Sequence, residues 1–526
     1  PPRSTLSSSS AASDVYKRQV VGVSGTRLYD ATTNAVASDL STHTNLVGTE
    51  TLNLSGTGTI ASKNVGSNKT VSVGTLALAD GSNGGLAANY TLSGGTHQLT
   101  VNQRPLNATL SRQYDGTTTS AGSDLSSFDA LQGGETLTLS GSGTSASANV
   151  ANGIAMSSNG NLALVDGTGL ASNYSLNSTV INITERVLNS SGSKIYDANT
   201  DALAADITLS NLVSGEALNH SGTATISSAN AGSYTITNLA GITIADGSGG
   251  TASNYTLTGG THNFTVNRRV VGVSGTRLYD ATTNAVASDL STHANLVGSE
   301  TLTLSGTGTI ASKDVGSNKT VSVGTLALAD GTNGGLAANY TLSGGTHQLT
   351  VNQRPLNATL ARQYDGTTAS AGSTLSSFDA LQGGETLTLS GSGTAANDNV
   401  ANGISVSSLG TLALVDGTGA ASNYSLNSTV INIAKRVLNS SGSKTYDANT
   451  NALASAITLS NLVSGEALNH SGTATISSAN AGSYTISNLT GVSIADGSGG
   501  AASNYTLTGG THNFTVNRRV VGVSGT

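Results

Sequence analysis

Hydrophobic and polar residues alternate over many short stretches of the chain. In TLTLSGSGT (136–144), Leu137 and Leu139 point to one face and the threonines to the other, and VINIT (180–184) alternates in the same way. A period of two residues predicts β-strands with one buried face. Clusters of Gly, Asn, Asp and Ser such as DGSNGG (80–85) separate these runs and predict turns. The pattern indicates a mostly β fold built from antiparallel sheets.

One type of segment breaks this alternation, at 37–48 and again at 123–134. In the second segment Leu125, Phe128 and Leu131 recur at three-residue spacing after Ser123. That spacing, with a serine at the start, predicts a short helix. We therefore expect one short helix in each repeated part of the chain.

The whole pattern recurs along the chain with two periods. The string VVGVSGT occupies 20–26, 270–276 and 520–526, and residues 20–110 differ from 270–360 at only five positions. Within this period of 250 residues lies a more diverged one of 82 to 85 residues, marked by a Tyr-Asp dipeptide. Such periods predict a tandem array of small modules, here six in the order A–B–C–A–B–C.

The predicted module boundaries follow from these matches. Residues 1–19 match no repeat and are interpreted as a non-native leader, and 519–526 as the truncated start of a seventh repeat in a fragment of a longer protein. The six repeats are A1 (20–103), B1 (104–185), C1 (186–268), A2 (269–353), B2 (354–435) and C2 (436–518).

Each module carries two tyrosine motifs and one acidic position between them. The Tyr-Asp motif comprises Tyr29, Asp30, Tyr114, Asp115, Tyr196, Asp197, Tyr279, Asp280, Tyr364, Asp365, Tyr446 and Asp447. A later Asn-Tyr pair contributes Tyr90, Tyr174, Tyr255, Tyr340, Tyr424 and Tyr505. The acidic position, after a glycine or Gly-x, is held by Glu50, Glu135, Glu216, Glu300, Glu385 and Glu466.

These motifs hold 12 of the 15 tyrosines. Because a tyrosine can bury about 150–250 Å², we expect them to anchor a separate small core in each module. We expect the Asp after each motif tyrosine to accept backbone hydrogen bonds in the turn that follows.

Composition excludes several classes of protein. The 526 residues include 66 Gly but no Cys, which excludes a disulfide scaffold, a zinc–thiolate site and a cysteine nucleophile. A net charge of -7 argues against a nucleic-acid partner, and no apolar run is long enough to span a membrane. Only 10% of residues are charged and the chain is rich in Ser, Thr and Asn, so disorder is an alternative. The fixed spacing of the tyrosines favours a specified fold.

Candidate chemistry is sparse. His97, His262, His347 and His512 follow Gly-Gly-Thr, and we expect them on strand surfaces, because zinc needs three or four converging ligands. Calcium is an alternative interpretation of loops such as DGSNGG, although calcium prefers six to eight oxygens and this loop has one acid. No other cofactor is indicated.

No catalytic residues are predicted, and we expect no enzymatic activity. Glu135 and Asp166 could pair in space as a glycosidase couple. Equivalent acids recur in every module, where roles in turns or at strand edges are the simpler explanation.

The Tyr-Asp motif, as in RQYDGTT, with the later Asp-Gly and Asn-Tyr landmarks, resembles the YDG-motif repeats of mirror β-grasp type found in bacterial haemagglutinin-like surface adhesins. The resemblance covers 20–526, and only Gly116 and Gly366 keep the glycine of the motif, whereas others have alanine, as at Ala31 and Ala198. It implies six mirror β-grasp-like modules, an extracellular location on a bacterial surface or in secreted form, and a role as an extended stalk. Each module would contact the neighbouring repeats of the same chain.

Two alternatives stay open at this point. The modules themselves could bind host or cell-surface glycans or proteins, with exposed Tyr and Asn as the contact surface. The strands could also form Ig-like sandwiches or one continuous β-solenoid instead of separate mirror β-grasp modules.

Overall fold

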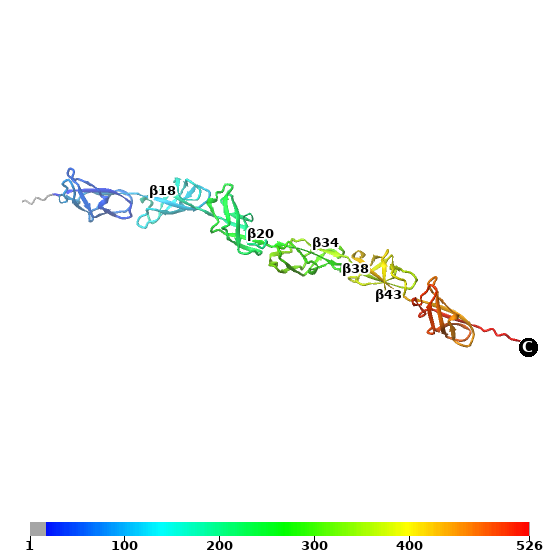
Figure 1. Ribbon diagram of the computed structural model, residues 1–526. Helices are drawn as coiled ribbons and strands as arrows, with labels where there is room; N and C mark the ends of the chain where they lie inside the picture. The colour runs from blue at the N-terminus through cyan, green and yellow to red at the C-terminus, as the bar shows by residue number, and fades with distance from the viewer. Residues whose placement is uncertain (1–16, 525–526) are drawn as a thin grey trace, which may run out of the picture. The chain divides into compact units, whose positions relative to one another are not determined.

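The computed structural model describes residues 17–524, which are mostly β, with 54% strand and 7% helical residues. Figure 1 colours the chain from its N-terminus to its C-terminus, and the strands of each module come from one continuous stretch of sequence. Residues 1–19 are interpreted as a leader, and 1–16 of them lie outside the described residues. Gln19 belongs to the first strand. Residues 525–526, at the end of the seventh-repeat segment, also lie outside them.

The chain divides into two compact units. One contains the residues up to Lys194 together with Asn199–Val266, and the other contains Ile195–Ala198 together with the chain from Asn267 onward. Every strand and 3₁₀ turn of A2, B2 and C2 has the bounds of its counterpart in A1, B1 and C1 shifted by 250 residues, so β28–β54 and η7–η12 repeat β1–β27 and η1–η6.

Module A1 is built on one curled, mixed sheet. Its first long strand, β2 (Gly22–Leu28), lies parallel to its last, β10 (His97–Asn102), at the centre of the order β3-β6-β7-β10-β2-β4. The other sheet strands are β3 (Asn34–Val36), β4 (Thr42–Thr44), β6 (Thr57–Ile60) and β7 (Gly66–Ser72). Two short pairs complete the module, β1 (Gln19–Val20) with β9 (Tyr90–Thr91) and β5 (Leu52–Ser55) with β8 (Ala77–Asp80).

Module B1 repeats this topology in the order β12-β15-β16-β18-β11-β13, again with its first and last strands parallel. Its strands are β11 (Arg104–Gln113), β12 (Thr119–Ala121), β13 (Leu125–Phe128), β14 (Leu137–Ser140), β15 (Ser142–Ser145), β16 (Ala151–Ser158), β17 (Ala163–Asp166) and β18 (Tyr174–Thr184).

Module C1 has the order β21-β23-β24-β27-β20-β22, with β25 added against β23. Its strands are β19 (Arg186–Val187), β20 (Asn189–Ile195), β21 (Asp201–Leu203), β22 (Ile207–Ser210), β23 (Leu218–Ile226), β24 (Gly232–Asn238), β25 (Ile242–Asp246), β26 (Tyr255–Thr256) and β27 (His262–Asn267).

The fold class expected from the sequence is confirmed: the protein is mostly β and consists of six repeated modules. Among residues 17–524 no strand pair joins two modules, which excludes a continuous β-solenoid. The parallel central pair also distinguishes each sheet from an Ig-like sandwich, whose sheets are antiparallel.

The expected short helix is wrong. The described helical residues form three-residue 3₁₀ turns, two per module: η1 (Ala37–Asp39), η2 (Ala87–Asn89), η3 (Gly122–Asp124), η4 (Ala171–Asn173), η5 (Ala204–Asp206) and η6 (Ala252–Asn254). After η3, the segment predicted as helix continues as β13 and pairs with β11, where Ala108 faces Phe128. A one-turn helix gains few hydrogen bonds for the residues it fixes, whereas the edge of β11 provides hydrogen-bond partners for residues 125–128.

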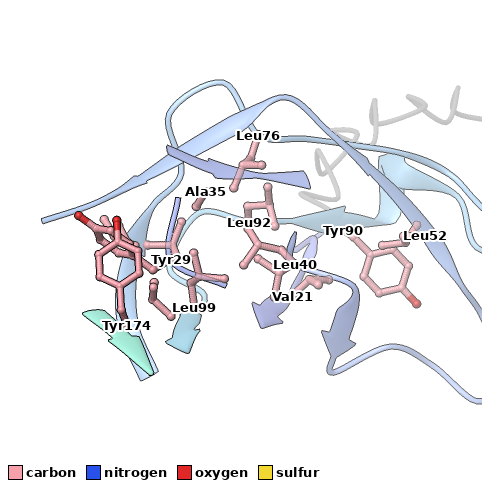
Figure 2. Packing of buried hydrophobic residues seen from close by; sticks show 14 of the residues in the cluster. Val21, Tyr29, Ala35, Leu40, Leu52, Leu76, Tyr90, Leu92, Leu99 and Tyr174 are labelled. Carbon is pink, nitrogen blue, oxygen red and sulfur yellow. The ribbon is translucent and has the colours of Figure 1, made fainter. Parts of the chain in front are cut away.

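The hydrophobic core of A1 extends beyond the module. Figure 2 shows Tyr29 beside Tyr174 of B1 at one end of the buried cluster, while Tyr90 lies at the other end. Leu106 and Leu137 of B1 belong to the same cluster. The expectation of a separate core in each module is therefore wrong here: a small domain has little interior of its own, and A1 completes its core with side chains of the module that follows.

Candidate functional site: the tyrosine junctions between modules

The two tyrosines of different modules meet at the A1–B1 junction. Tyr29 directly follows β2, and its backbone N–H donates to the Asn102 carbonyl at the end of β10. Its ring packs edge to face on Tyr174, which begins β18, with ring centroids 5.2 Å apart. Aromatic pairs of this geometry stabilise a protein by about 0.5–1.5 kcal/mol beyond the area they bury. The end of the central strand pair of one module is thus joined to the last strand of the next.

Glu135 lies beneath this pair and accepts a hydrogen bond from each tyrosine. The Tyr29 hydroxyl lies 2.6 Å from Oε1 and the Tyr174 hydroxyl 2.9 Å from Oε2. Lys63 of A1 adds an ion pair, with Nζ 2.5 Å from Oε1. Glu135 is only 9% exposed, and both of its carboxylate oxygens are satisfied, as a buried charge requires.

These contacts shift the titration of the cluster. Burial raises the pKa of Glu135, but the hydrogen bonds from Lys63, Tyr29 and Tyr174 outweigh it and hold the pKa below its ordinary value. Burial, with the hydrogen bond to Glu135, raises the pKa of Tyr174 to about 12. At neutral pH the junction therefore holds one carboxylate and two neutral phenols.

Asn173, beside Tyr174, forms a second link across the same junction. Its Oδ1 accepts from the Val65 N–H at 2.9 Å, and its Nδ2 donates to Asn64 Oδ1 at 3.0 Å. From the start of B1, Arg104 Nε donates to the Tyr29 carbonyl at 2.7 Å. The turn of A1 that holds Lys63 is thereby fixed to B1 through its backbone as well as through its side chains.

The B1–C1 junction has the same plan. The hydroxyls of Tyr114 and Tyr255 donate to Glu216 at 2.7 and 2.6 Å, and the two ring centroids lie 5.4 Å apart. Asn254 accepts from the Val150 N–H at 2.9 Å and donates to Asn149. In the alignment of the modules Ala148 takes the place of Lys63, so this junction lacks the ion pair.

The second unit repeats both junctions. Tyr279 and Tyr424 donate to Glu385, which also pairs with Lys313, and Tyr364 and Tyr505 donate to Glu466. Within the same unit, Tyr196 and Tyr340 donate to Glu300, with ring centroids 5.4 Å apart.

The remaining motif tyrosines lack this cross-module partner among the described residues. Tyr90 is buried and donates to Glu50 of its own module. Tyr446 is 37% exposed, although it holds the same motif position as Tyr114.

The aspartates of the Tyr-Asp motif act in the turn, as expected. Asp30 Oδ1 accepts from the Thr32 N–H, and Asp115 Oδ1 from the Thr117 N–H, both at 2.9 Å. Equivalent bonds are made by Asp280, Asp365 and Asp447. These bonds shape the turn that presents the preceding tyrosine to the next module.

The expectation for the histidines is wrong for three of the four. His97, His262 and His347 are buried; His97 is 5% exposed, and its Nε2 lies 2.8 Å from the Leu92 carbonyl. The ring fills the space under a turn and bonds to the backbone there. Within residues 17–524 no group of three or more His, Asp or Glu is placed to hold a metal ion.

The acids of the loops cap turns. Asp80, in the DGSNGG loop considered for calcium, accepts from the Ala87 N–H at 2.8 Å at the start of η2. Asp166 accepts from the Ala171 N–H at 2.6 Å, while Glu135 is committed to the junction. Each acid of the suggested catalytic pair therefore has its own structural partners.

Sequence reasoning missed which tyrosines pair. It placed both tyrosines of a module in one core, whereas five of the six Tyr-Asp tyrosines meet the Asn-Tyr tyrosine of the following module. It also assigned the glutamate to a turn or a strand edge and gave Lys63 no role, whereas both lie at the junction. A signal was present in the regular recurrence of a lone acid at Glu135 and Glu216 among few charged residues, because an acid kept in a largely apolar setting needs donors nearby.

The comparison with known families agrees with these six units. Six segments match the YDG domain, at residues 17–100, 97–181, 184–262, 265–350, 346–431 and 434–512. The chain therefore belongs to the YDG domain family. A search of curated proteins found no match. Among the described residues, no helix has the length and apolar character needed to cross a membrane.

Proposed function

We propose that this chain is part of a secreted bacterial surface adhesin, in which the tandem YDG modules act as a structural stalk. The observation that supports the proposal is the buried Tyr–Tyr–Glu cluster repeated between successive modules within each unit. A stalk must keep its modules from turning freely about each other, and the cluster opposes such motion.

Rotation of one module against the next would break the contacts at the junction. Two hydroxyl bonds to a carboxylate would be lost, and hydrogen bonds to charged groups contribute about 1.5–3 kcal/mol each. The apolar contact of two buried tyrosine rings would be lost as well. Flexible Gly/Ser linkers offer no comparable resistance, and Asn102-Gln103-Arg104 leaves only one residue between β10 and β11.

The proposal places the protein outside the cell, on the bacterial surface or in the medium, with a mechanical and non-enzymatic role. The absence of Cys is compatible with export of an unfolded chain, since no disulfide has to be avoided on the way. Nucleic acid is not among the proposed partners. The proposed partners are host or cell-surface glycans and proteins, which would bind at sites other than the motif tyrosines.

A role in which the modules bind glycans through exposed motif tyrosines has less support. Eleven of the twelve motif tyrosines are buried, and Tyr446 is the exception. Their hydroxyls donate to glutamates instead of facing solvent. The buried motif tyrosines therefore do not offer the contact surface that this alternative needs, and a glycan site would need another surface.

The test compares the intact chain with a variant in which the junction glutamates Glu135, Glu216, Glu300, Glu385 and Glu466 are changed to Ala. Small-angle scattering should give the parent a larger maximum dimension than the variant, because free junctions let the chain fold back on itself. Glu50→Ala, whose tyrosine partner belongs to its own module, is the matched control and should match the parent. Equal dimensions for parent and five-site variant, with the modules still folded by circular dichroism, would contradict the stalk role.

A further inference from the structure

The residue after Tyr-Asp differs between module types, and the structure shows what it contacts. In B1 this residue is Gly116, at φ +78°, and a Cβ placed on it would lie 2.9 Å from Val213 Cγ1 of C1. In B2 a Cβ on Gly366 would lie 2.7 Å from Val463 Cγ1. Valine is stiff about χ1, so it cannot easily turn away from an added methyl group.

Backbone conformation alone does not require this glycine. Ala31 and Ala198 hold the same motif position in A1 and C1 with φ of 62° and 64°. Alanine is therefore accepted in the left-handed region at this turn, although it is an uncommon residue there. The contact with Val213 is the feature that sets the B modules apart.

The A1–B1 junction has the opposite arrangement. Here the methyl group belongs to Ala31 of the first module, and the glycine is Gly133 of the second: a Cβ on Gly133 would lie 2.8 Å from Ala31 Cβ. The A2–B2 junction repeats this, with 2.8 Å between a Cβ on Gly383 and Ala281 Cβ. At both kinds of junction one module contributes a side chain and the other contributes a glycine that leaves room for it.

We propose that these size-matched pairs make the A–B and B–C junctions selective for the type of module that follows, so that a C module is accepted after B and disfavoured after A. The two pairs are Gly116 with Val213 and Ala31 with Gly133. An A module placed before C would bring its alanine against Val213. A B module placed before another B would set Gly116 against Gly133 and Ala148 near Glu135. Compared with A–B, such a junction would lack the methyl group of Ala31 and the ion pair of Lys63.

The test measures opening of one junction in the intact chain by hydrogen exchange. The Val150 N–H bonds to Asn254 across B1–C1, and the Val65 N–H bonds to Asn173 across A1–B1. Gly116→Ala should speed exchange at Val150 by roughly five- to hundredfold and leave Val65 unchanged, as expected for one added methyl group in a packed contact. In the Val213→Ala background, the same substitution should have little further effect.

Gly153→Ala is the matched control for backbone strain. Gly153 lies in the same module at φ +67°, with nothing within 4 Å of an added Cβ. If Gly116→Ala opens the junction no more than Gly153→Ala does, or if Val213→Ala does not remove its effect, the selectivity proposal is wrong. The reciprocal pair, Gly133→Ala with and without Ala31→Gly, should show the same rescue at Val65.

Discussion

The A1–B1 and B1–C1 junctions share two tyrosines, one glutamate and one asparagine, but only the first has a lysine. Glu135 accepts from Tyr29, Tyr174 and Lys63, whereas Glu216 accepts from Tyr114 and Tyr255. The geometry of the rings is nearly the same, at 5.2 and 5.4 Å between centroids. The tyrosine–carboxylate arrangement therefore does not need the cation, and the ion pair is an addition specific to A–B.

The two junctions also show which motif residues are shared by all junctions and which differ between them. The tyrosine serves each described junction, whereas the residue after Tyr-Asp is alanine in A and C modules and glycine in B modules. The position of Lys63 holds Ala148 in B1 and Asp398 in B2. Because A–B and B–C each occur twice, a substitution at a position that is identical in both units can be compared with the same change in the other unit.

The largest effect is expected from removing a junction tyrosine. Tyr114→Ala should lower the free energy of unfolding by about 3–5 kcal/mol, since a large buried side chain and its hydrogen bond are lost. The loss should reach both B1 and C1, because Tyr114 packs against Tyr255. Urea unfolding with exchange mass spectrometry would locate it. Tyr446→Ala is the control and should have a smaller effect, since Tyr446 is 37% exposed; loss confined to B1 would contradict the shared junction.

A smaller effect is expected from the glutamates, and it should differ between the two junctions. Glu135→Gln should cost about 1.5–3 kcal/mol, because it weakens bonds to a charged group and leaves Lys63 without its partner. Glu216→Gln should cost less, about 0.5–1.5 kcal/mol, because an amide can still bond to both hydroxyls. Chemical unfolding of each variant measures the difference. If Glu135→Gln and Glu216→Gln lower the free energy of unfolding equally, and Lys63→Met does not change the effect of Glu135→Gln, the ion pair contributes nothing to stability.

The ion pair predicts an acid dependence of A1–B1. The folded-state pKa of Glu135 lies below its ordinary value of 4.5, so the unfolded state binds the proton more tightly. The stabilisation is fully present above pH 4.5 and is lost as the pH falls through the folded-state pKa. Lys63→Met removes one cause of the lowered pKa and should move this loss to higher pH. Urea midpoints of both proteins between pH 3 and 7 would test it, and identical profiles would be evidence against the assignment.

The smallest effect is expected at a natural difference between the two units. Asn64 accepts from Asn173 in A1–B1, whereas Asp314 accepts from Asn423 in A2–B2. Hydrogen bonds from Asn423 and Ser312 hold the pKa of Asp314 below its ordinary value. Asn64→Asp should therefore stabilise A1–B1 by less than about 1 kcal/mol, and Asp314→Asn should weaken A2–B2 by a similar amount. Amide exchange should become slower at Val65 in Asn64→Asp and faster at Val315 in Asp314→Asn. A change in the same direction in both variants would contradict this prediction.

Much of the fold could be predicted because it is local in sequence. The alternation at Leu137 and Leu139 gave β14, and the recurrence of the Tyr-Asp motif gave the six modules. The short helix was wrongly predicted because the spacing of Leu125 and Phe128 also suits a 3₁₀ turn followed by a strand. A local pattern does not show which sheet edge is open to receive a segment.

The junction could not be predicted for a related reason. Tyr29 lies 61 residues from Tyr90 and 145 from Tyr174 along the chain, and both spacings recur with the modules. Regular spacing therefore marked the tyrosines as important without showing which pair meets. The choice depends on where the central strands end, because β2 and β10 deliver Tyr29 to the far end of A1, away from Tyr90 (Figure 2).

The tyrosine–glutamate clusters hold successive modules together within each unit. The most direct measurement is amide exchange at Val65, Val150, Val315 and Val400 in the intact protein, since each N–H bonds to an asparagine of the next module. The account predicts protection comparable to that of the central strands, lost at Val150 when Glu216 is changed to Ala. Exchange at the rate of exposed loops in the unmodified protein would contradict it.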